Sequence, residues 1–415
     1  MPQFIRLGFF LALRQMRRAS IWTTGLIIFI MTLTFLNLVV VSGILVGLIE
    51  GAVEANKQFY TSDIIITKLE KKNYIEQSPF IESVIKSLPE VSAMSARYIE
   101  SGKVEANYKT AANPDEIDTA AGTFVGIDPV AEDNLTHISR FVVEGEYLND
   151  DDYDEILIGG YLLKRYFPVE SPGFATLDQV EVGDKVRVTI GNVTREMRIK
   201  GVVMTKVDEV SMRVFFVDKQ FRELIGQNDY NVDEISIKLH DGVEPAVVKG
   251  AIIRSGIDKY AKVQTFEDAQ PKFLKDIKDT FALLGNFISS IGLAVASITI
   301  FIVIFINAIT RRKFIGILKG IGISGKTIET SYVFQSFFYA VCGSGLGVTI
   351  LYGFLEPFFL AHPINFPFSD GILVAPLNGT IIKIFVLVIT TIIAGYIPAR
   401  MIVRKNTLDS ILGRN

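Results

Sequence analysis

Four long apolar runs dominate the hydropathy pattern of this chain. They lie at residues 21–49, 281–309, 328–355 and 381–399, and ionisable residues in them are absent or confined to the ends. A helix of roughly 20 residues crosses the hydrocarbon core of a bilayer, so each run is long enough to span it. The pattern therefore predicts four transmembrane helices.

An amphipathic segment at residues 1–20 precedes the first apolar run. Its apolar positions are Phe4, Leu7, Phe10 and Leu11, and its basic positions are Arg6, Arg14, Arg17 and Arg18. The hydrophobic region of a cleavable signal peptide has about 7–15 residues, and the run that follows here is about twice as long. We therefore expect residues 1–20 to form a helix at the membrane surface that leads into a retained span.

Between the first two runs, residues 50–280 alternate between strand-like and helix-like stretches, which is typical of a folded α+β domain. The beginning and the end of this segment together predict a βαβ subdomain. Its expected elements are strands at Asp63–Thr67, Val91–Glu105 and Val263–Gln264 and helices at Ser78–Leu88 and Pro245–Ser255. Ser78, directly before a proline, is the expected N-cap of the first of these helices.

The middle of the segment is rich in strand patterns. Lys185–Ile190 and Thr194–Ile199 alternate with a period of two, and Gly191–Asn192 between them is a two-residue hairpin signal. We therefore predict a β-rich subdomain beside the βαβ subdomain, and a charged helical stalk at Phe266–Thr280 that enters the second span. The predicted fold class is a membrane protein with four transmembrane α-helices and a large extracytoplasmic α+β domain.

The distribution of charge predicts on which side of the membrane each loop lies, because short loops rich in Lys and Arg stay in the cytoplasm. Residues 1–20, 310–327 and 400–415 carry basic clusters, whereas the short loop 356–380 has no Lys or Arg. The segment from Glu50 to Asp279 holds 28 basic and 41 acidic residues. We therefore expect a multi-pass protein of the cytoplasmic membrane, with both termini inside and the large domain and the short loop outside.

Composition excludes several classes of function. A net charge of −3 gives no basic surface for nucleic acid, and a single cysteine, Cys342, allows no internal disulfide framework. The three histidines are scattered without metal-ligand spacing, and neither GxSxG nor HExxH occurs. The acidic run Asp150–Asp154 is interpreted as a solvated loop rather than a cation site. No catalytic residue and no metal site are predicted.

One stretch matches a nucleotide-binding pattern. Gly320–Thr327 fits GxxxxGK[ST], in which backbone N–H groups cradle phosphates where a strand passes into a helix. Such a loop also needs an acidic partner for magnesium in the same α/β domain. The short segment between two spans has no room for that domain, so we interpret the match as a glycine-rich turn between two helices.

The residues around this turn form the candidate site. The stretch begins with Arg311, Arg312 and Lys313, continues with an apolar stripe of Phe314, Ile317, Leu318 and Ile321, and is broken at Gly320 and Gly322. A short amphipathic helix of this kind docks in a groove of another protein or lies on lipid with its basic residues at anionic headgroups. The residues alone leave both interpretations open.

Residues 311–338, RRKFIGILKGIGISGKTIETSYVFQSFF, resemble the cytoplasmic coupling segment of MacB-type ABC transporter permeases, which include LolC and LolE within the FtsX-like permease superfamily. The segments FVGIDP, VGDKVRV and TFEDAQPKFLK and the ending AGYIPARMIVRKNTLDSIL are similar too, so the resemblance covers nearly the whole chain. The chain departs from the family at Phe314, where an acid is usual, and around Thr407–Leu408, where the family has a proline.

The resemblance implies a permease subunit that couples ATP hydrolysis by a separate ABC ATPase dimer to extraction or export of a substrate at the outer face of the membrane. A lipoprotein, a peptide or a hydrophobic small molecule would each suit such a machine. ATP and magnesium would bind to the ATPase, and this chain would bind no cofactor and be no enzyme. The residues expected to couple to the ATPase are Arg311, Arg312, Lys313, Phe314, Ile317, Leu318, Gly320 and Gly322.

Small residues recur at four-residue spacing in two of the spans. They are Gly43, Gly47 and Gly51 in the first, and Gly343 and Gly347 in the third. This spacing lets helices approach closely, either within the four-helix unit or across a dimer seam. The resemblance implies a second permease, as an identical copy or a paralogue, besides contacts with membrane lipids and an extracytoplasmic acceptor or adaptor.

Two other functions stay open. An FtsX-like transmembrane regulator would use its external domain to activate an extracytoplasmic partner such as a cell-wall hydrolase, without transport, although external domains of that group are much smaller. A membrane-bound receptor or enzyme without an ATPase would need a ligand site or a catalytic site between residues 50 and 279, and the sequence shows none.

Overall fold

The computed structural model describes residues 3–113, 116–167, 175–178, 180–270, 272–362, 364–366, 369–371 and 373–404. The chain forms two compact units. A helical unit comprises residues 1–50, 276–366 and 370–415, and a globular unit comprises residues 51–275 and 367–369. Most of the predicted tail 400–415, including Thr407–Leu408, lies outside the described residues.

In the part of the chain that the structure describes, four helices are long and apolar enough to cross a membrane, in agreement with the four predicted spans. The first is continuous over Ile21–Thr61. It is built from α2 (Ile21–Leu36), η1 (Asn37–Val41), α3 (Ser42–Asn56) and η2 (Lys57–Thr61). The others are α10 (Lys272–Thr310), α12 (Gly325–Ile350) with its continuation η7 (Leu351–Leu355) and α13 (Glu356–Ala361), and α14 (Leu377–Val403).

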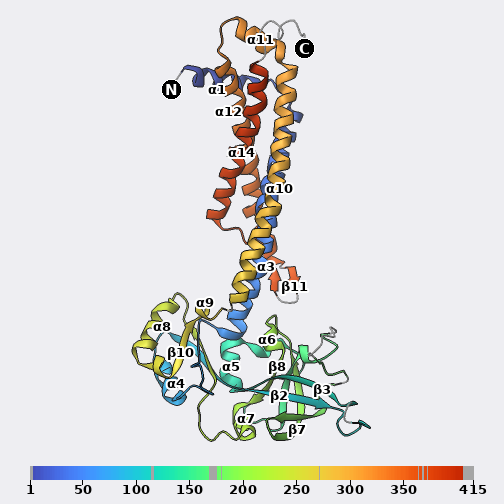
Figure 1. Ribbon diagram of the computed structural model, residues 1–415, viewed down its shortest axis with the longest axis vertical. Coiled ribbons are helices and arrows are strands. Elements are labelled where there is room, and N and C mark those ends of the chain that lie inside the picture. Colours follow the sequence, from blue (N-terminus) through green and yellow to red (C-terminus); the bar gives the residue numbers. More distant parts are fainter. Residues whose placement is uncertain are drawn as a thin grey trace. The chain divides into compact units, whose positions relative to one another are not determined.

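Helix α12 is the centre of the helical unit. It packs against α14, α2 and the amphipathic α1 (Gln3–Arg17) (Figure 1). Two glycines on α12 make the contact with α2 possible. A Cβ atom at Gly343 would lie 2.3 Å from Met31 Cβ, and one at Gly347 would lie 2.2 Å from Phe35 Cδ1. Both glycines therefore serve helix packing within the unit, which is the usual role of small residues in lipid.

The globular unit is built on a ten-stranded sheet, as far as its described residues show. One half of the sheet has the strand order β10-β1-β9-β2. With its two helices, this half is a βαββαβ arrangement of the ferredoxin type. Its elements are β1 (Ile64–Lys68), α4 (Ser78–Lys86), β2 (Val91–Ala106), β9 (Glu234–Leu239), α8 (Pro245–Arg254) and β10 (Ala261–Thr265). The structure thus confirms a βαβ subdomain that the last part of the segment completes.

The other half of the sheet is inserted between β2 and β9. Its strands are β3 (Asp118–Ile127), β4 (Val142–Gly145), β5 (Glu155–Gly159), β6 (Lys185–Ile190), β7 (Val193–Val203) and β8 (Arg213–Val217). Short helices in this stretch are α5 (Pro129–Thr136), α6 (Asp208–Ser211) and α7 (Asp218–Ile225). The predicted hairpin is confirmed, because Ile190 pairs with Val193 across Gly191. Strand β2 pairs with β9 through its first residues and with β3 through its last, so one sheet joins both subdomains.

Three predicted elements differ in detail. Gln77, at φ 61°, is the N-cap of α4 in place of Ser78, whose Oγ donates to Ile75 O at 2.6 Å instead. The stalk predicted over Phe266–Thr280 is not one helix, because α9 (Phe266–Ala269) ends before α10 begins. The loop predicted at 356–380 contains α13, the start of α14 and two short strands, β11 (Ile364–Phe366) and β12 (Ser369–Gly371).

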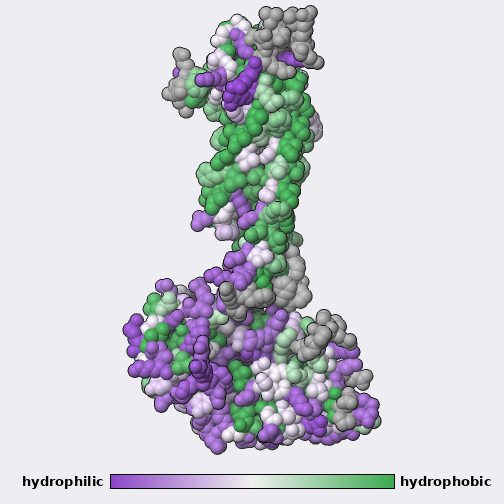
Figure 2. Space-filling model, in the orientation of Figure 1, coloured by the Kyte–Doolittle hydropathy of each residue, from purple (hydrophilic) through white to green (hydrophobic). Residues whose placement is uncertain are grey.

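Hydropathy distinguishes the surfaces of the two units. Hydrophobic residues cover much of the long helices, and hydrophilic residues cover most of the globular unit (Figure 2). Many apolar side chains on α2, α10 and α14 face outward and are not covered by any other residue that the structure describes. A lipid environment for these helices follows from their length and from this exposed apolar surface.

Candidate coupling site

The candidate site begins where α10 ends. Arg311, at φ −99° and ψ 13°, breaks the helix after Thr310, and α11 (Arg312–Gly320) follows. Helix α11 ends in a Schellman motif, in which the Ile323 N–H donates to Leu318 O and the Gly322 N–H donates to Lys319 O, both at 3.0 Å. Gly322 adopts φ +93°, a conformation that favours glycine, so the glycine break has a local cause.

The next helix, α12, begins directly after this turn. Ser324 is its N-cap and accepts a hydrogen bond from the Thr327 N–H at 3.3 Å. The GxxxxGK[ST] match at Gly320–Thr327 is therefore the turn between two helices, as predicted. A helix precedes the glycines where a phosphate-binding loop would have a strand, so the match lacks the required strand, loop and helix order.

One face of α11 holds the helix in place. Ile315 is buried, and Leu318 and Ile323 pack against the core of the helical unit. The Lys319 ammonium also donates to Val403 O at 3.0 Å, which links α11 to the last turn of α14. Leu318, which the sequence analysis placed in one apolar stripe with Phe314 and Ile317, thus packs on the inner side of α11.

The other face of α11 is apolar and exposed. Phe314 and Ile317 are 63% and 51% exposed, and Ile321, the C-cap directly after α11, is 71% exposed; the three stand at positions i, i+3 and i+7. Within the part of the chain that the structure describes, no other element covers them. We name these three residues the α11 patch. Arg311, Arg312 and Lys313 stand at the start of the helix, so the patch begins beside positive charge.

Helix α1 extends the apolar surface next to the α11 patch. It is fixed to α12, because Gln335 donates to Gln15 at 2.5 Å and the rings of Phe9 and Phe334 meet edge to face at 5.3 Å. A cavity of about 810 Å³ lies between α1 and the turn after α11. Its lining residues are Phe4, Arg6, Leu7, Phe10, Ile321, Gly322, Ile323, Ser324 and Thr327. The segment predicted to lie on the membrane surface therefore packs on the bundle and borders the candidate site.

The glycines of the first span have different surroundings. A Cβ atom at Gly43 would lie 2.7 Å from Val374 O. Because glycine has no side chain, the segment that precedes α14 can pack directly against α3 at this position. Gly47 is buried and Gly51 is half-buried. The contact of Gly43 is internal to the helical unit, and its predicted role at a dimer seam stays a prediction, like those of Gly47 and Gly51.

In the globular unit, the continuation of the first membrane helix ends in a buried ionic cluster. The Arg97 guanidinium donates to Glu132 at 2.7 and 2.9 Å and to the Tyr60 carbonyl at 3.0 Å, and it also pairs with Glu234. Arg213 donates to Tyr60 Oη at 2.9 Å. A cation at a helix C-terminus stabilises the helix dipole, so Arg97 fixes the end of η2 both by charge and by hydrogen bonding.

The charges of this cluster are balanced by direct partners. Burial raises the pKa of Glu132, but the charge and hydrogen bonds of Arg97 outweigh burial and hold that pKa below its ordinary value. Ala55, one helical turn before Phe59, is buried. The ring centroids of Phe59 and Phe141 lie 4.6 Å apart. The helix end is thus embedded in the core of the globular unit, which suits the transfer of a displacement from the helix to the sheet.

The acidic run Asp150–Asp154 is engaged by basic side chains. Asp152 pairs with Lys200 at 2.5 Å, and Asp154 pairs with Arg195 at 2.8 Å. Among the described residues, no group of His, Cys, Asp and Glu is arranged to hold a metal ion. The surface around Asp150–Asp154 is therefore held by ion pairs.

Sequence reasoning missed the buried cluster around Arg97 and the single lysine Lys383. Arg97 lies in a strand whose pattern gave no sign that a distant helix end would meet it, because Glu132, Arg213 and Glu234 come from other elements. Lys383 in α14 did carry a signal, since it is a lysine at the edge of an otherwise apolar run.

Known proteins similar to this chain include membrane permeases. The model of the family described as "FtsX-like permease C-terminal" matches residues 286–407. Macrolide export ATP-binding/permease protein MacB 2 of Aeromonas hydrophila subsp. hydrophila is 25% identical over 194 residues, which cover 45% of this chain and 28% of that protein. The uncharacterized ABC transporter permease MJ1507 of Methanocaldococcus jannaschii is 23% identical over 281 residues, 66% of this chain and 65% of that protein.

Two solved structures resemble part of this chain more distantly. The periplasmic region of MacB from Actinobacillus actinomycetemcomitans has a TM-score of 0.37 at 15% identity, over 52% of this chain and 94% of that one. The extracellular domain of the ABC-type transporter YknZ from Gram-positive bacteria has a TM-score of 0.33 at 13% identity, over 49% of this chain and 99% of that one.

The region that matches the family model includes the candidate site. The matched residues 286–407 hold α11, its turn and the spans on either side. The chain covers only about a quarter of the length of the MacB protein, whose name also includes an ATP-binding part. Residues 286–407 are therefore an FtsX-like permease domain, and over part of its length the chain is similar to ABC transporter permeases of the MacB type.

Proposed function

We propose that this chain is the permease subunit of an ABC transporter that couples ATP hydrolysis by a separate ATPase to the extraction or export of a lipoprotein, a peptide or a hydrophobic small molecule. The observation that carries the proposal is the α11 patch. Phe314, Ile317 and Ile321 are exposed, while Ile315 and Leu318 anchor the same helix from inside. An apolar helix face on a rigid base suits insertion into a groove of a partner.

Displacement of α11 would reach both spans next to it. Only Arg311 separates α11 from α10, and only the turn at Ile321–Ser324 separates it from α12. Helix α10 continues without a break from Lys272 to Thr310. A continuous helix of this length transmits a push along its axis better than a flexible loop does, because its backbone hydrogen bonds keep it stiff.

In this proposal α11 and both termini face the cytoplasm, and the globular unit faces the outside of the cytoplasmic membrane. The basic residues of segments 1–20 and 310–327 support this orientation. ATP and magnesium bind to the ATPase dimer, and this chain binds no cofactor. The globular unit would meet an extracytoplasmic acceptor or adaptor.

A second permease, identical or paralogous, completes the proposed assembly. Support comes from the outer face of α10, where exposed apolar residues alternate at spacings of three and four. They are Leu284, Ile288, Ile291, Val295, Ile298, Ile302, Ile306 and Ile309. This repeat is the one that keeps a helix seam in register with a partner helix.

The test is a purification of the full chain from its native cells in mild detergent. The double variant Phe314→Asp/Ile317→Asp removes the apolar character of the α11 patch without touching the anchoring residues. Val130→Asp/Val247→Asp is the matched control, since these valines of the globular unit are 58% and 60% exposed. Mass spectrometry identifies an ABC ATPase among the bound proteins, and ATP turnover of each preparation is measured.

The proposal predicts that an ABC ATPase and its ATP turnover accompany the wild type and the control but are reduced at least about tenfold in the patch variant, since burying two charges in an interface costs several kcal/mol. Equal recovery with all three forms would contradict a role for α11. An ATPase bound to a chain that moves no substrate, together with activation of an external hydrolase, would favour the regulator instead.

A further inference from the structure

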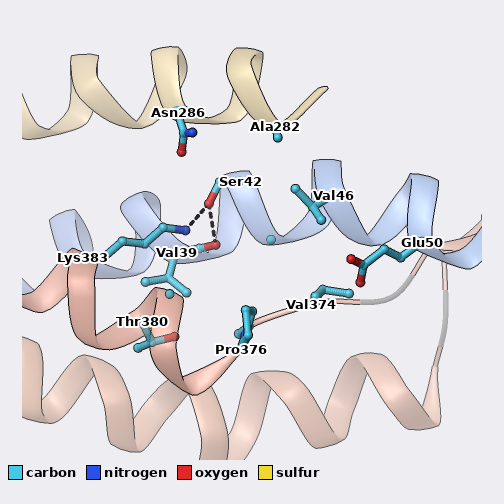
Figure 3. Close-up of a pocket in the computed structure, with 13 residues that line it drawn as sticks. Val39, Ser42, Val46, Glu50, Ala282, Asn286, Val374, Pro376, Thr380 and Lys383 are labelled. Atoms are coloured by element: carbon cyan, nitrogen blue, oxygen red, sulfur yellow. Dashed lines mark hydrogen bonds between the residues drawn. The ribbon is translucent and has the colours of Figure 1, made fainter. Parts of the chain in front are cut away.

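A small pocket with a few polar side chains in a mostly apolar lining lies at the start of α14 within the helical unit (Figure 3). Its volume is about 160 Å³, and its walls come from η1 and α3, from α10, and from residues 374–383. Lys383 of α14 extends across the pocket toward Ser42 of α3, and Asn286 of α10 faces the same space. Three spans therefore place polar groups around one cavity.

Lys383 has spare hydrogen-bonding capacity in this pocket. Its ammonium donates to Ser42 Oγ, the acceptor that the described residues provide. Ser42 Oγ lies 3.1 Å from Leu38 O and 3.2 Å from Val39 O, so its own hydrogen is directed to the backbone and a lone pair is left for the lysine. An ammonium has three N–H donors, so two remain for a ligand.

The pocket offers Lys383 no free counter-charge. Across the described residues, no carboxylate comes within ion-pair distance of its ammonium. The carboxylate that lines the pocket, Glu50, is paired with Lys278 at 3.0 Å. A cation in a membrane-spanning helix is costly without a partner, and such residues commonly mark binding sites or ion pathways.

The walls of the pocket are held in place without a ligand. The Val374 N–H donates to Gly43 O at 3.2 Å, which fixes the segment before α14 against α3. On the other side, Tyr352 Oη lies 2.9 Å from both Ala375 O and Thr380 Oγ1. The site is therefore preformed, and a ligand would not have to order these segments first.

We propose that this pocket binds the phosphate of a phospholipid headgroup, with Lys383 as its counter-charge and Ser42 and Asn286 as hydrogen-bonding neighbours. Sites for drug-sized ligands measure about 300–1,000 Å³, so this cavity takes a headgroup but not a peptide. Exposed apolar residues next to the lining residues on α10 and α14 offer a surface for acyl chains. They are Leu283, Phe287, Ile382 and Phe385.

The proposal is independent of any ATPase, because it concerns only the helical unit and the bilayer. Its test is native mass spectrometry of the delipidated full chain in neutral detergent, titrated with phosphatidylglycerol. Lys383→Met removes the charge and keeps the length of the side chain, and Lys383→Arg keeps the charge. Lys326→Met, an exposed lysine of α12 outside the pocket, is the matched control for the loss of one positive charge.

We expect Lys383→Met to weaken the tightest phosphatidylglycerol binding at least about tenfold, since a charged hydrogen-bond partner is lost. Lys383→Arg and Lys326→Met should bind as the wild type does, which also shows that the variants fold. Unchanged phosphatidylglycerol binding by Lys383→Met would show that this pocket is not the lipid site. Displacement of the lipid by inorganic phosphate at low millimolar concentration would show that the pocket binds free phosphate and not a lipid headgroup.

Discussion

At the scale of single residues, the most demanding positions lie in the globular unit. Arg97 is fully buried and bonded to two carboxylates and to the Tyr60 carbonyl in the last turn of a helix that continues from the first span. Removal of one member of a buried ionic group leaves the others uncompensated, which costs far more than the loss of a surface ion pair. This cluster therefore fixes the end of the helix at a definite point on the sheet.

Arg97→Met is expected to destabilise the globular unit by about 3–5 kcal/mol, because Glu132 and Glu234 would stay buried without their cation. For a domain of this size that corresponds to a drop in the unfolding midpoint on the order of 10 °C. Circular dichroism of the full chain in detergent measures it. The control is Lys86→Met, which removes an exposed pair with Glu82 and should shift the midpoint by only about 1–2 °C. Equal shifts would refute the importance of the cluster.

The same cluster predicts a pH dependence. The pKa of Glu132 is below its ordinary value in the folded state, after burial, which raises it, has been outweighed by Arg97. Its carboxylate therefore contributes stability above the unfolded-state pKa of about 4.3, and that contribution is lost as the pH falls through the folded-state pKa. Glu132→Gln should be less stable at pH 7 and should lose less stability between pH 5 and pH 3. Parallel pH curves for both proteins would count against this account.

At the scale of elements, the contact between α12 and α2 depends on two glycines that point inward. Gly343→Val would bring a branched side chain against Met31, and we expect a loss of folded, monodisperse protein in detergent. Gly345→Val is the matched control, because a Cβ atom at Gly345 meets no atom within 4 Å. Size-exclusion chromatography compares the two. If Gly343→Val elutes and melts as Gly345→Val does, the close packing of these helices is not required.

Elements with a strong periodic pattern could be predicted from the sequence, and those set by distant contacts could not. The four spans, the Gly191–Asn192 hairpin and the turn at Gly322 each have a local cause in hydropathy or in glycine chemistry. The inward orientation of Leu318 and the break between α9 and α10 depend on what packs nearby. The partners of Arg97 and the pocket at Lys383 come from elements that are far apart in the sequence, so no local pattern contains them.

For the whole molecule, the distribution of charged residues predicts the orientation of the chain in the membrane. Basic residues gather at 1–20 and 310–327, and the globular unit has more acidic than basic residues. We therefore expect single cysteines to label differently after Cys342→Ser. Val247→Cys in the globular unit should react with a membrane-impermeant maleimide on intact spheroplasts. Gly320→Cys in α11 should react only after lysis, and labelling of Gly320→Cys before lysis would reverse the proposed topology.

Photo-crosslinking in living cells would show directly whether α11 contacts an ABC ATPase. A p-benzoylphenylalanine in place of Phe314 puts the reactive group on the α11 patch, and the same replacement at Tyr230 puts it on the exposed surface of the globular unit. We expect a crosslink to an ABC ATPase from position 314 and none from position 230. An absence of ATPase crosslinks at position 314, in cells where the chain is folded and abundant, would contradict it.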